Sequence, residues 1–577
     1  MELKKDVEKY HSFLNKEEIE NICNEYISSD VLDYDEFIEK YNKERIYLFL
    51  SNIGENILSW YRMKENSKVL EISSDFGQIS NIILNKNLQI KKYEIDPLKI
   101  KFFNKRFKDN KNINILSINE IENEQDKYDY VIISNVIDSF KDSKEVFNIV
   151  KKVLKDDGIL LFIFENGNSI NSFSRADNEQ GMLYMLNDYN NFTLSKLNKN
   201  LENINMNEKN MYYSFPNSYL PTSIYEDKFF VENVKSVSYP AIINSSDIVV
   251  ANEEDMLNQV LKENPSLIKY FANAYIIEAS YNKIEQKISM ASFNNYRKKD
   301  YTLSTVISQN KVYKLPRCEE ANTHLENIKE GISYLKNIGE DFIDTTDENG
   351  IVYSPYISGK QTLDKDIYLK YKETKDLNEV AKIYIESYKL LSSKILKYKD
   401  VQKSELLDGI PDEVLSKMNY LEVCPWDMVA KNCFLVEKED GIHYIYFDQE
   451  WYEKGLPIEF LIYRSVLNSY DLVKKINVNE LFKILGIEEY TKYFDAINQK
   501  LFEKILDKKI HSLYTNENLK IDNLLYALKE ASIYKENIKD YIENNKRQDN
   551  YIKQLEAQLE ELKSKRLKYK VKKLFKK

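Results

Sequence analysis

Three polar residues toward the C-terminal end have the types and spacing that phosphoryl transfer from a nucleotide requires. Asp427 and Asn432 lie five positions apart in CPWDMVAKN, and Asp448 follows the apolar run 444–447. In that chemistry one carboxylate orients or deprotonates the attacking hydroxyl, while an Asn and a second Asp hold Mg²⁺ on the triphosphate. Two hairpin strands between Asn432 and Asp448 would bring these two side chains together.

The same spacing also occurs in ordinary turns, because Asp and Asn side chains hydrogen-bond to nearby backbone groups. Three further features favour the chemical interpretation. Apolar, strand-like residues follow Asn432, and Asp448 closes a second apolar run in FDQEW. A VYK triplet that ends at Lys314 lies upstream. Together these features favour a phosphoryl-transfer site over a simple turn.

These residues resemble the atypical kinases of the aminoglycoside and choline phosphotransferase type, whose pattern is D-x4-N followed by an I-D-x-E strand end. The resemblance implies an α+β bilobal kinase-like domain that uses ATP and Mg²⁺. It implies Asp427 as the base, Asn432 and Asp448 as Mg²⁺ ligands, and Lys314 on the nucleotide phosphates. In this sequence Pro425-Trp426 stands where these families usually have His-Gly before the base.

Neighbouring charged residues are expected to support this site. Residues 318–337 form an amphipathic helix, and kinases pair an acid of such a helix with the phosphate-binding lysine. Glu320, Glu326 and Glu330 are the candidates, and we select Glu326 for this pairing. The alternative is an ordinary solvated acid. The triplet 297–299 either replaces a glycine-rich phosphate loop or forms a charged turn, and we favour the turn. Arg464 either pairs with Glu450 or binds a substrate anion, and we favour the pair.

A second set of polar residues follows the strands of region 67–165, where strand and helix patterns alternate. The first strand passes through SSDFGQIS into a helix, and the second ends in Glu94. Such alternation predicts a parallel, doubly wound α/β sheet. An acid about 20 residues past a glycine-rich turn is where such a sheet places its ribose ligand. The predicted strands are 68–72, 89–95, 113–117, 130–134 and 158–165.

VLEISSDFGQIS resembles the first motif of class I S-adenosylmethionine-dependent methyltransferases, written V-L-E-x-G-x-G-x-G, and YEIDP resembles their ribose-binding strand end. DYVIISNVID and LKDDGILLFIFEN resemble their fourth and fifth strands, and the similarity covers residues 53–235. It implies a Rossmann-like fold that binds S-adenosylmethionine. The implied contacts are Glu71 by the methionine amino end, Glu94 on the ribose hydroxyls, Glu120 at the adenine amine and Asn135 near the methyl donor.

The three motif glycines correspond to Ser73, Asp75 and Gly77, so only the last is a glycine in this chain. Glycines there allow positive φ and a close approach of the backbone to the ligand. Asp75 also places a carboxylate near the carboxylate of the ligand. The alternative to a functional cofactor site is therefore a methyltransferase-derived scaffold.

Composition limits the class of protein. The chain has 577 residues, of which 43% are hydrophobic and 31% charged, and its net charge is −10. Nine basic residues and no acid follow Glu561, so the body before it is more acidic still. An acidic body argues against nucleic-acid binding. Four cysteines without metal-type pairing, and an N-terminus without an apolar leader, fit a reduced cytoplasmic protein.

Four segments are expected: an N-terminal helical segment at 1–66, a methyltransferase-like domain with an insertion at 67–285, a kinase-like phosphotransferase domain at 286–535, and a helical tail at 536–577. Apolar residues at 3-4-3 spacing in the tail predict a short coiled coil and a homodimer. The basic end either lies peripherally on an anionic membrane at its inner face or is a soluble basic end. The spaced residues are Ile552, Leu555, Leu559 and Leu562.

NILSWY and YYSFPNSYLPTSIYEDKF, on either side of the sheet, resemble a bacterial methyltransferase subgroup found with surface-polysaccharide and glycan biosynthesis. The expected function is therefore a transferase that methylates and phosphorylates a bacterial surface glycan or a small hydroxyl-bearing precursor. The alternatives are a catalytically degenerate scaffold of a glycan-assembly complex, or a protein in which only the kinase half is active.

Overall fold

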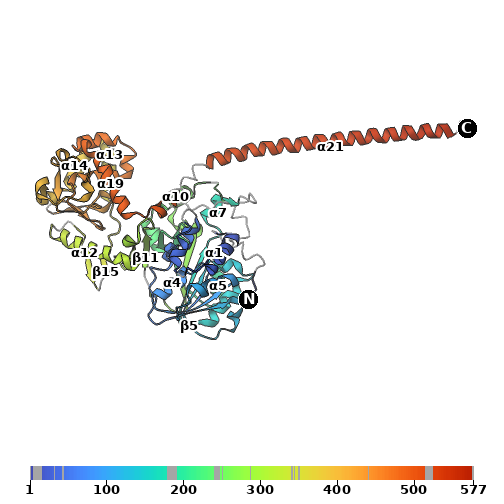
Figure 1. The fold of residues 1–577 in the computed structure, drawn as a ribbon, viewed down its shortest axis with the longest axis horizontal. Helices are drawn as coiled ribbons and strands as arrows, with labels where there is room; N and C mark the ends of the chain where they lie inside the picture. Colours follow the sequence, from blue (N-terminus) through green and yellow to red (C-terminus); the bar gives the residue numbers. More distant parts are fainter. Residues whose placement is uncertain are drawn as a thin grey trace.

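A computed structural model shows two globular parts and one long helix that extends away from them (Figure 1). The N-terminal part contains β1 to β5 and the helices around them, and the second part carries most of the later helices. The residues that the structure describes are 2–3, 14, 16–31, 33–41, 45–73, 75–177, 192–239, 247–249, 251–285, 288–338, 342–343, 345–348, 351–439, 441–513 and 524–574.

The N-terminal part is built on a parallel sheet, as the alternating pattern predicts. β1 pairs in parallel with β2 and β4, β3 pairs with β2, and β5 pairs with β4. The apolar run of β5 is fully buried because helices cover both faces of a parallel sheet. The strands are β1 (Lys68–Ser73), β2 (Gln89–Glu94), β3 (Ile113–Ser117), β4 (Tyr128–Ser134) and β5 (Leu154–Glu165).

The crossover helices begin at residues that satisfy their free N–H groups. Asp96 caps α5 (Pro97–Arg106) by accepting the Leu98 N–H at 2.8 Å, and Asp142 caps α6 (Ser143–Val153). Glycine at position 77 has φ of 100° and precedes α4 (Gln78–Asn85). These caps place the first turn of each helix beside the carboxyl end of the preceding strand.

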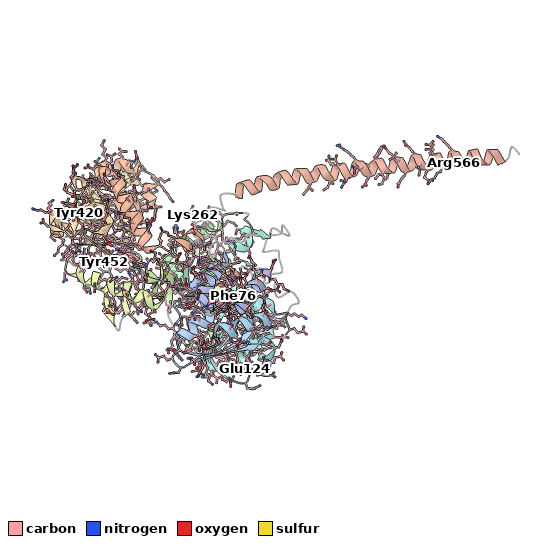
Figure 2. All side chains as sticks on the ribbon, in the orientation of Figure 1. Phe76, Glu124, Lys262, Tyr420, Tyr452 and Arg566 are labelled. Atoms are coloured by element: carbon pink, nitrogen blue, oxygen red, sulfur yellow. The ribbon has the colours of Figure 1, made fainter. Side chains whose placement is uncertain are left out.

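The N-terminal helical segment packs over this edge of the sheet. Its elements are α1 (Lys16–Ser28), α2 (Tyr34–Ile38), α3 (Arg45–Leu50) and a 3-10 helix, η2 (Asn52–Ile57). Phe76, which lies on the loop after β1, is fully buried and contacts the rings of Phe49 and Phe102 at centroid distances of 5.8 and 5.4 Å. Figure 2 shows Phe76 inside this body. The loop is thus fixed by its own aromatic residue.

Two strands between residues 194 and 233 belong to the central sheet, within the stretch expected to hold an insertion. β7 (Glu208–Phe215) lies beside β10 (Ala274–Ser280), which in turn pairs with β5. The apolar residues of β7 are buried, although polar Asn- and Ser-rich segments surround them in the sequence. Residues 178–191 and 240–246 lie outside the described structure. The other elements here are α8 (Leu194–Asn203), β8 (Ser223–Glu226) and α9 (Asp227–Asn233).

The sheet continues across the expected domain boundary at 285. β8 pairs with β11 in antiparallel register, with Tyr225 opposite Met290. The complete order is β14-β15-β13-β12-β11-β8-β7-β10-β5-β4-β1-β2-β3. The strands beyond β8 are antiparallel, as expected for this segment. They are β11 (Ile288–Phe293), β12 (Leu303–Ser308), β13 (Lys311–Pro316), β14 (Thr346–Glu348) and β15 (Ile351–Pro355).

Helix α12 (Asn322–Lys336) crosses from β13 to β14 and packs closely on the segment after β20. A Cβ at Gly331 would lie 2.1 Å from Tyr452 Cε2, so only glycine allows this approach. Figure 2 places Tyr452 in the second globular part. The buried face of α12 also carries His324, Leu325 and Ile328. The helix therefore presents a fixed face to the predicted phosphoryl-transfer residues.

The remainder of the second part is mainly helical and surrounds a hairpin. Strands β19 (Cys433–Lys438) and β20 (Gly441–Tyr446) pair in antiparallel register, as predicted for this stretch. An antiparallel sheet with one helix is thus followed by a mainly helical part. The main helices are α13 (Leu363–Thr374), α14 (Leu377–Ser387), α16 (Ile458–Leu467), α18 (Val478–Ile484) and α19 (Thr491–Ile505).

Short elements complete the described structure. They are α7 (Ile170–Ser174), β6 (Arg175–Asp177), β9 (Asp247–Val249), α10 (Glu253–Glu263), α11 (Ile268–Phe271), β16 (Ile395–Lys397), α15 (Asp412–Leu415), β17 (Asn419–Leu421), β18 (Val423–Cys424), β21 (Glu453–Lys454) and α17 (Tyr470–Val473). None of the described helices is both long enough and apolar enough to cross a lipid bilayer.

The tail is a single helix, α21 (Leu524–Leu574), which begins before residue 536 and stands apart from the globular parts (Figure 1). Arg566 lies toward its far end (Figure 2). The side chains of 567–577, which include most of the basic end, lie outside the described structure. Coiled-coil pairing and membrane contact stay predictions. The residues at 3-4-3 spacing are exposed: Ile552, Leu555, Leu559 and Leu562.

Candidate functional site

The predicted phosphoryl-transfer residues of the hairpin region lie together. The Asn432 side-chain N–H donates to the Asp427 backbone carbonyl at 3.0 Å. The Phe447 N–H donates to the Asn432 carbonyl, also at 3.0 Å, which brings the neighbouring Asp448 back to this point. Asp448 has φ of 58°, in the left-handed region that only a few non-glycine residues adopt. The returning hairpin thus acts as predicted.

Lys314 extends from β13 to the same place. Its Nζ lies 2.7 Å from Asp448 Oδ1 and 3.2 Å from Glu450 Oε2. Burial alone would lower the pKa of Lys314, but these carboxylates outweigh it and hold the pKa above its ordinary value. The structure therefore joins the two distant sequence signals, the VYK triplet and FDQEW, at one site.

A cavity of about 230 Å³ opens beside Lys314 and is bounded mainly by apolar side chains. Strands β12, β13 and β15 form one wall, α12 contributes to another, and the aromatic side chains Phe434 and Phe447 close the opposite side. The rings of Phe434 and Phe447 stack at a centroid distance of 4.4 Å. An apolar slot that ends at a lysine and two carboxylates suits a nucleotide. Its nucleobase would lie between the apolar side chains and its phosphates beside the lysine.

Asp427 is held by the backbone of the segment after Asp448. Its Oδ2 accepts the N–H groups of Glu450 at 2.6 Å and Trp451 at 3.2 Å. Its Oδ1 is buried and has no partner in the described structure. Burial raises the pKa of Asp427 to about 8, although the Glu450 N–H opposes this shift. One carboxylate oxygen is thus fixed, and the other is buried without a hydrogen bond in the described structure.

The predicted pairing of Glu326 with Lys314 is wrong. Glu326 is exposed and pairs instead with Lys329 at 2.8 Å. It lies two positions after the buried His324, and two positions on an α-helix point in nearly opposite directions. Glu450 lies next to Lys314 instead. The signal in the sequence that could have identified Glu450 is its position two residues after Asp448.

The predicted pair of Arg464 with Glu450 is also wrong. Arg464 Nε donates to the Trp426 carbonyl at 2.9 Å, and its guanidinium lies over the Trp426 ring at 4.6 Å. Trp426, one of the two residues that stand in place of His-Gly, thus anchors the loop by packing against Arg464. The turn favoured at 297–299 does not form, because Arg297 bridges to Leu506 and Lys299 begins a 3-10 helix, η7 (Lys299–Tyr301). Arg297, not Arg464, contacts Glu450.

In the parallel sheet, the other candidate residues lie at the carboxyl ends of β1, β2 and β4. Doubly wound sheets bind ligands outside these ends, where the strand order reverses. Asp75 accepts the N–H groups of Gly77 at 3.1 Å and Ile79 at 2.8 Å. Its carboxylate therefore caps α4 and lies where the helix N-terminus would otherwise attract an anionic ligand group.

The predicted contact of Glu71 with a ligand amine stays a prediction, and Glu71 already has internal partners. Glu71 is fully buried, and both of its oxygens have partners. Lys92 Nζ lies 2.6 Å from Oε1, which also accepts from Ser73 Oγ at 2.7 Å, and Ser80 Oγ donates to Oε2 at 2.8 Å. Lys92 is opposite Glu71 in the pairing of β1 with β2, so an internal ammonium occupies the place expected for the ligand amine.

Glu94 fits its predicted role on a ribose. Its Oε1 accepts the N–H groups of Ile95 at 2.8 Å and Asp96 at 3.1 Å. Its Oε2 is buried without a partner in the described part of the chain. Burial raises the pKa of Glu94 above its ordinary value. A buried carboxylate oxygen without a partner at the end of β2 suits the paired hydroxyls of a ribose.

Glu120 and Asn135 have different outcomes. Glu120 is exposed, and its side chain accepts the Ser117 N–H at 3.2 Å in a capping box, so its predicted contact with adenine is not supported. Asn135 follows β4 with φ of 54°, and its Oδ1 accepts Ser218 Oγ at 3.0 Å. Asn135 therefore lies at the expected edge of the sheet.

Three residues here were not predicted: Lys92, Glu165 and Ser218. In QIKKYE, two-residue alternation places Lys92 on the same face as Glu94, which was a usable signal. Glu165 ends β5, and its Oε1 accepts the Ser218 N–H at 2.8 Å and also contacts the Ser218 hydroxyl. Ser218 thereby connects Glu165 to Asn135 across the ends of β4 and β5.

Glu165 gives a prediction for stability against pH. Burial raises the pKa of Glu165 to about 7, so the folded chain binds this proton more tightly than the unfolded chain. The resulting stability is complete below the pKa of the unfolded carboxyl and is lost as pH rises through about 7. Between pH 5 and 8, we expect the free energy of unfolding to fall by about 2 kcal/mol more in the unaltered chain than in Glu165→Gln. Urea unfolding at both pH values measures this, and equal slopes would contradict it.

Comparison with known proteins bears on the parallel sheet. Residues 70–160 match a family profile described as a methyltransferase domain. The structure is similar to the plantazolicin methyltransferase BpumL in complex with SAH, at 14% identity over 46% of this chain and 95% of that chain, with a TM-score of 0.26. It is also similar to a SAM-dependent methyltransferase from Archaeoglobus fulgidus, at 16% identity over 43% of this chain and 98% of that chain, with a TM-score of 0.26. A comparison with curated protein sequences found no match.

The family match begins within β1 and ends within β5, so it coincides with the parallel sheet. It does not include the second globular part, where the kinase-like assignment stays a prediction. It supports the prediction that the chain is a transferase. Residues 70–160 of this chain therefore match a methyltransferase domain profile, and they have a Rossmann-like fold.

Proposed function

We propose that the chain is a two-site transferase that modifies a bacterial surface glycan or its small hydroxyl-bearing precursor. The methyltransferase domain takes S-adenosylmethionine, and the kinase-like domain transfers the terminal phosphoryl group of Mg-ATP to a hydroxyl. The observation that carries the second activity is the contact of Lys314 with Asp448 at the lining of an apolar cavity, beside the loop in which Asn432 bonds to Asp427.

Each residue of the kinase-like site has a role that matches its surroundings. Asp427, with one free buried oxygen, orients the acceptor hydroxyl and takes its proton as the new oxygen–phosphorus bond forms. The bond from the terminal phosphorus to the bridging oxygen breaks, and ADP leaves. Asn432 and Asp448 supply the oxygen ligands that Mg²⁺ prefers in nucleotide sites, where phosphates complete its coordination. Lys314 holds the phosphates.

The methyltransferase site is supported at its ribose end. The free oxygen of Glu94 faces a position that a ribose would fill, and Asn135 lies at the adjoining strand end. S-adenosylmethionine would supply an activated methyl group there. Since Lys92 already neutralises Glu71, the methionine end of the ligand must be held by other groups. That internal pair favours a second candidate, in which this domain is a scaffold and only the kinase-like domain is active.

Calorimetric titration of the full chain separates these candidates. We expect S-adenosylmethionine to bind in the micromolar range and Glu94→Gln to weaken it roughly 10- to 100-fold, because a hydrogen bond to a charged group contributes about 1.5–3 kcal/mol. Glu120→Gln is the matched control, since Glu120 is an exposed cap, and it should leave the affinity unchanged.

Mg-ATP is titrated into the same protein. If Mg-ATP binds and S-adenosylmethionine does not bind up to millimolar concentration, the methyltransferase domain is a scaffold. If neither ligand binds, the two-site proposal is rejected.

A further inference from the structure

One buried carboxylate, that of Glu450, connects three separate elements of the kinase-like part. Its Oε2 lies 3.2 Å from Lys314 Nζ on β13. Its Oε1 lies 3.0 Å from His324 Nε2 on α12 and also contacts the Arg297 guanidinium between β11 and β12. The Glu450 side chain is only 5% exposed, so these interactions are shielded from water. A buried carboxylate in this position restrains the side chain of the neighbouring Lys314.

The backbone of Glu450 is fixed independently of its side chain. Its N–H donates to Asp427 Oδ2 at 2.6 Å. The next residue, Trp451, stacks on Trp426 at 5.3 Å and on His324 at 4.3 Å. The carboxylate is therefore anchored to the loop of the proposed base. It cannot follow Lys314 if that side chain moves.

Lys314 has two acidic neighbours, which differ in burial. The Asp448 side chain is 43% exposed, whereas that of Glu450 is 5% exposed. In the proposed reaction Asp448 holds Mg²⁺ and must give up its contact with Lys314. Glu450 then remains as the carboxylate beside Lys314. The α12 acid that usually provides this contact is absent here, because His324 occupies the inward face of the helix.

Arg297 connects Glu450 to the end of the helical part. Its neighbours Tyr296 and Lys298 bond through their backbone groups to the end of α19 and the segment after it. The Asp507 N–H donates to the Tyr296 carbonyl at 2.7 Å, and the Lys298 N–H donates to the Ile505 carbonyl at 2.9 Å. The position of Arg297 is thus set by the end of the helical part. Through Glu450, this end of the chain is connected to Lys314.

We propose that Glu450 positions Lys314 for the nucleotide phosphates, in place of an acid on α12, and that Arg297 and His324 hold Glu450 for this task. The inference rests on the proposed phosphoryl transfer from Mg-ATP. Glu450 acts through Lys314 and not by touching the substrate. Its effect must therefore fall on the triphosphate and not on the base of the nucleotide.

The test compares Mg-ATP with adenosine as probes, both titrated into the full chain. In Glu450→Gln we expect the affinity for Mg-ATP to fall roughly 10- to 100-fold, the range expected for a charged hydrogen bond, while adenosine affinity stays within about threefold. Glu326→Gln is the matched control on the exposed face of α12 and should change neither affinity. A general loss of structure would lower both affinities together.

A double-variant cycle shows whether Glu450 acts through the lysine. Lys314→Met should reduce the preference for Mg-ATP over adenosine by itself, and adding Glu450→Gln should then change that preference less than twofold. An unchanged preference in Glu450→Gln, or equal loss of both ligands, would overturn this inference alone. Failure of the unaltered chain to bind Mg-ATP would overturn the proposed function and this inference with it.

Discussion

Replacing Asp427 with Asn is expected to lower phosphoryl transfer from Mg-ATP by roughly 10²- to 10⁴-fold, the usual contribution of a general base. Asn has nearly the same shape, and its side-chain oxygen can still accept the N–H groups of Glu450 and Trp451. It cannot take a proton from the acceptor hydroxyl. Mg-ATP affinity should therefore stay within about threefold, because Asn432, Asp448 and Lys314 are unchanged. Asp427→Ala should abolish transfer in the same way.

The measurement is ADP formation with simple hydroxyl acceptors such as glycerol or glucose, alongside calorimetric binding of Mg-ATP. Asp412→Asn is a suitable control, because the Asp412 side chain is 80% exposed and pairs only with surface groups. It should retain full activity. Retained transfer in Asp427→Asn would reject Asp427 as the base. A parallel loss of Mg-ATP binding would show that the substitution had damaged the loop instead.

The parts of this molecule that local patterns specify could be predicted from the sequence. The five parallel strands follow from apolar runs separated by helical periodicity, since each signal lies within a window of about ten residues. The hairpin that returns Asp448 to Asn432 is equally local. These elements required no knowledge of which distant segments meet.

The predictions that failed depend on contacts between segments that are far apart in the sequence. β7 was missed because its register depends on β10, which follows some sixty residues later and brings its own buried strand to the pairing. Glu326 was selected from the acids of the helix, but the inward face of α12 carries His324, and Gly331 packs against Tyr452. In both cases the deciding contact joins segments that are far apart in sequence.

The candidate sites show the same division. Residue type and spacing singled out Asp427, Asn432, Asp448 and Glu94, which lie at local turns and strand ends, and their roles stay predictions. The partners of charged groups could not be assigned, because several acids competed for each cation. Lys314 pairs with Glu450 and not with Glu326 because Glu450 is buried beside it. Glu71 pairs with Lys92 because both side chains are buried together. Burial of charge is a property of the assembled fold.

The buried pair of Lys92 and Glu71 leads to the largest expected effect on stability. Both side chains are fully buried, and no water is accessible to either. Replacing Lys92 with Met removes the ammonium and leaves the Glu71 carboxylate buried without its counter-charge. Removing one partner of a buried pair typically costs about 3–5 kcal/mol. We expect Lys92→Met to lower the free energy of unfolding by this amount, measured by urea unfolding of the full chain.

A double variant separates charge from packing in this experiment. In Lys92→Met with Glu71→Gln neither charge remains, and Gln can still bond to Ser73 and Ser80, so most of the lost stability should return. Lys101→Met, an exposed lysine on α5, should cost less than about 0.5 kcal/mol. A loss below about 1 kcal/mol in Lys92→Met would mean that Glu71 becomes protonated or solvated at little cost.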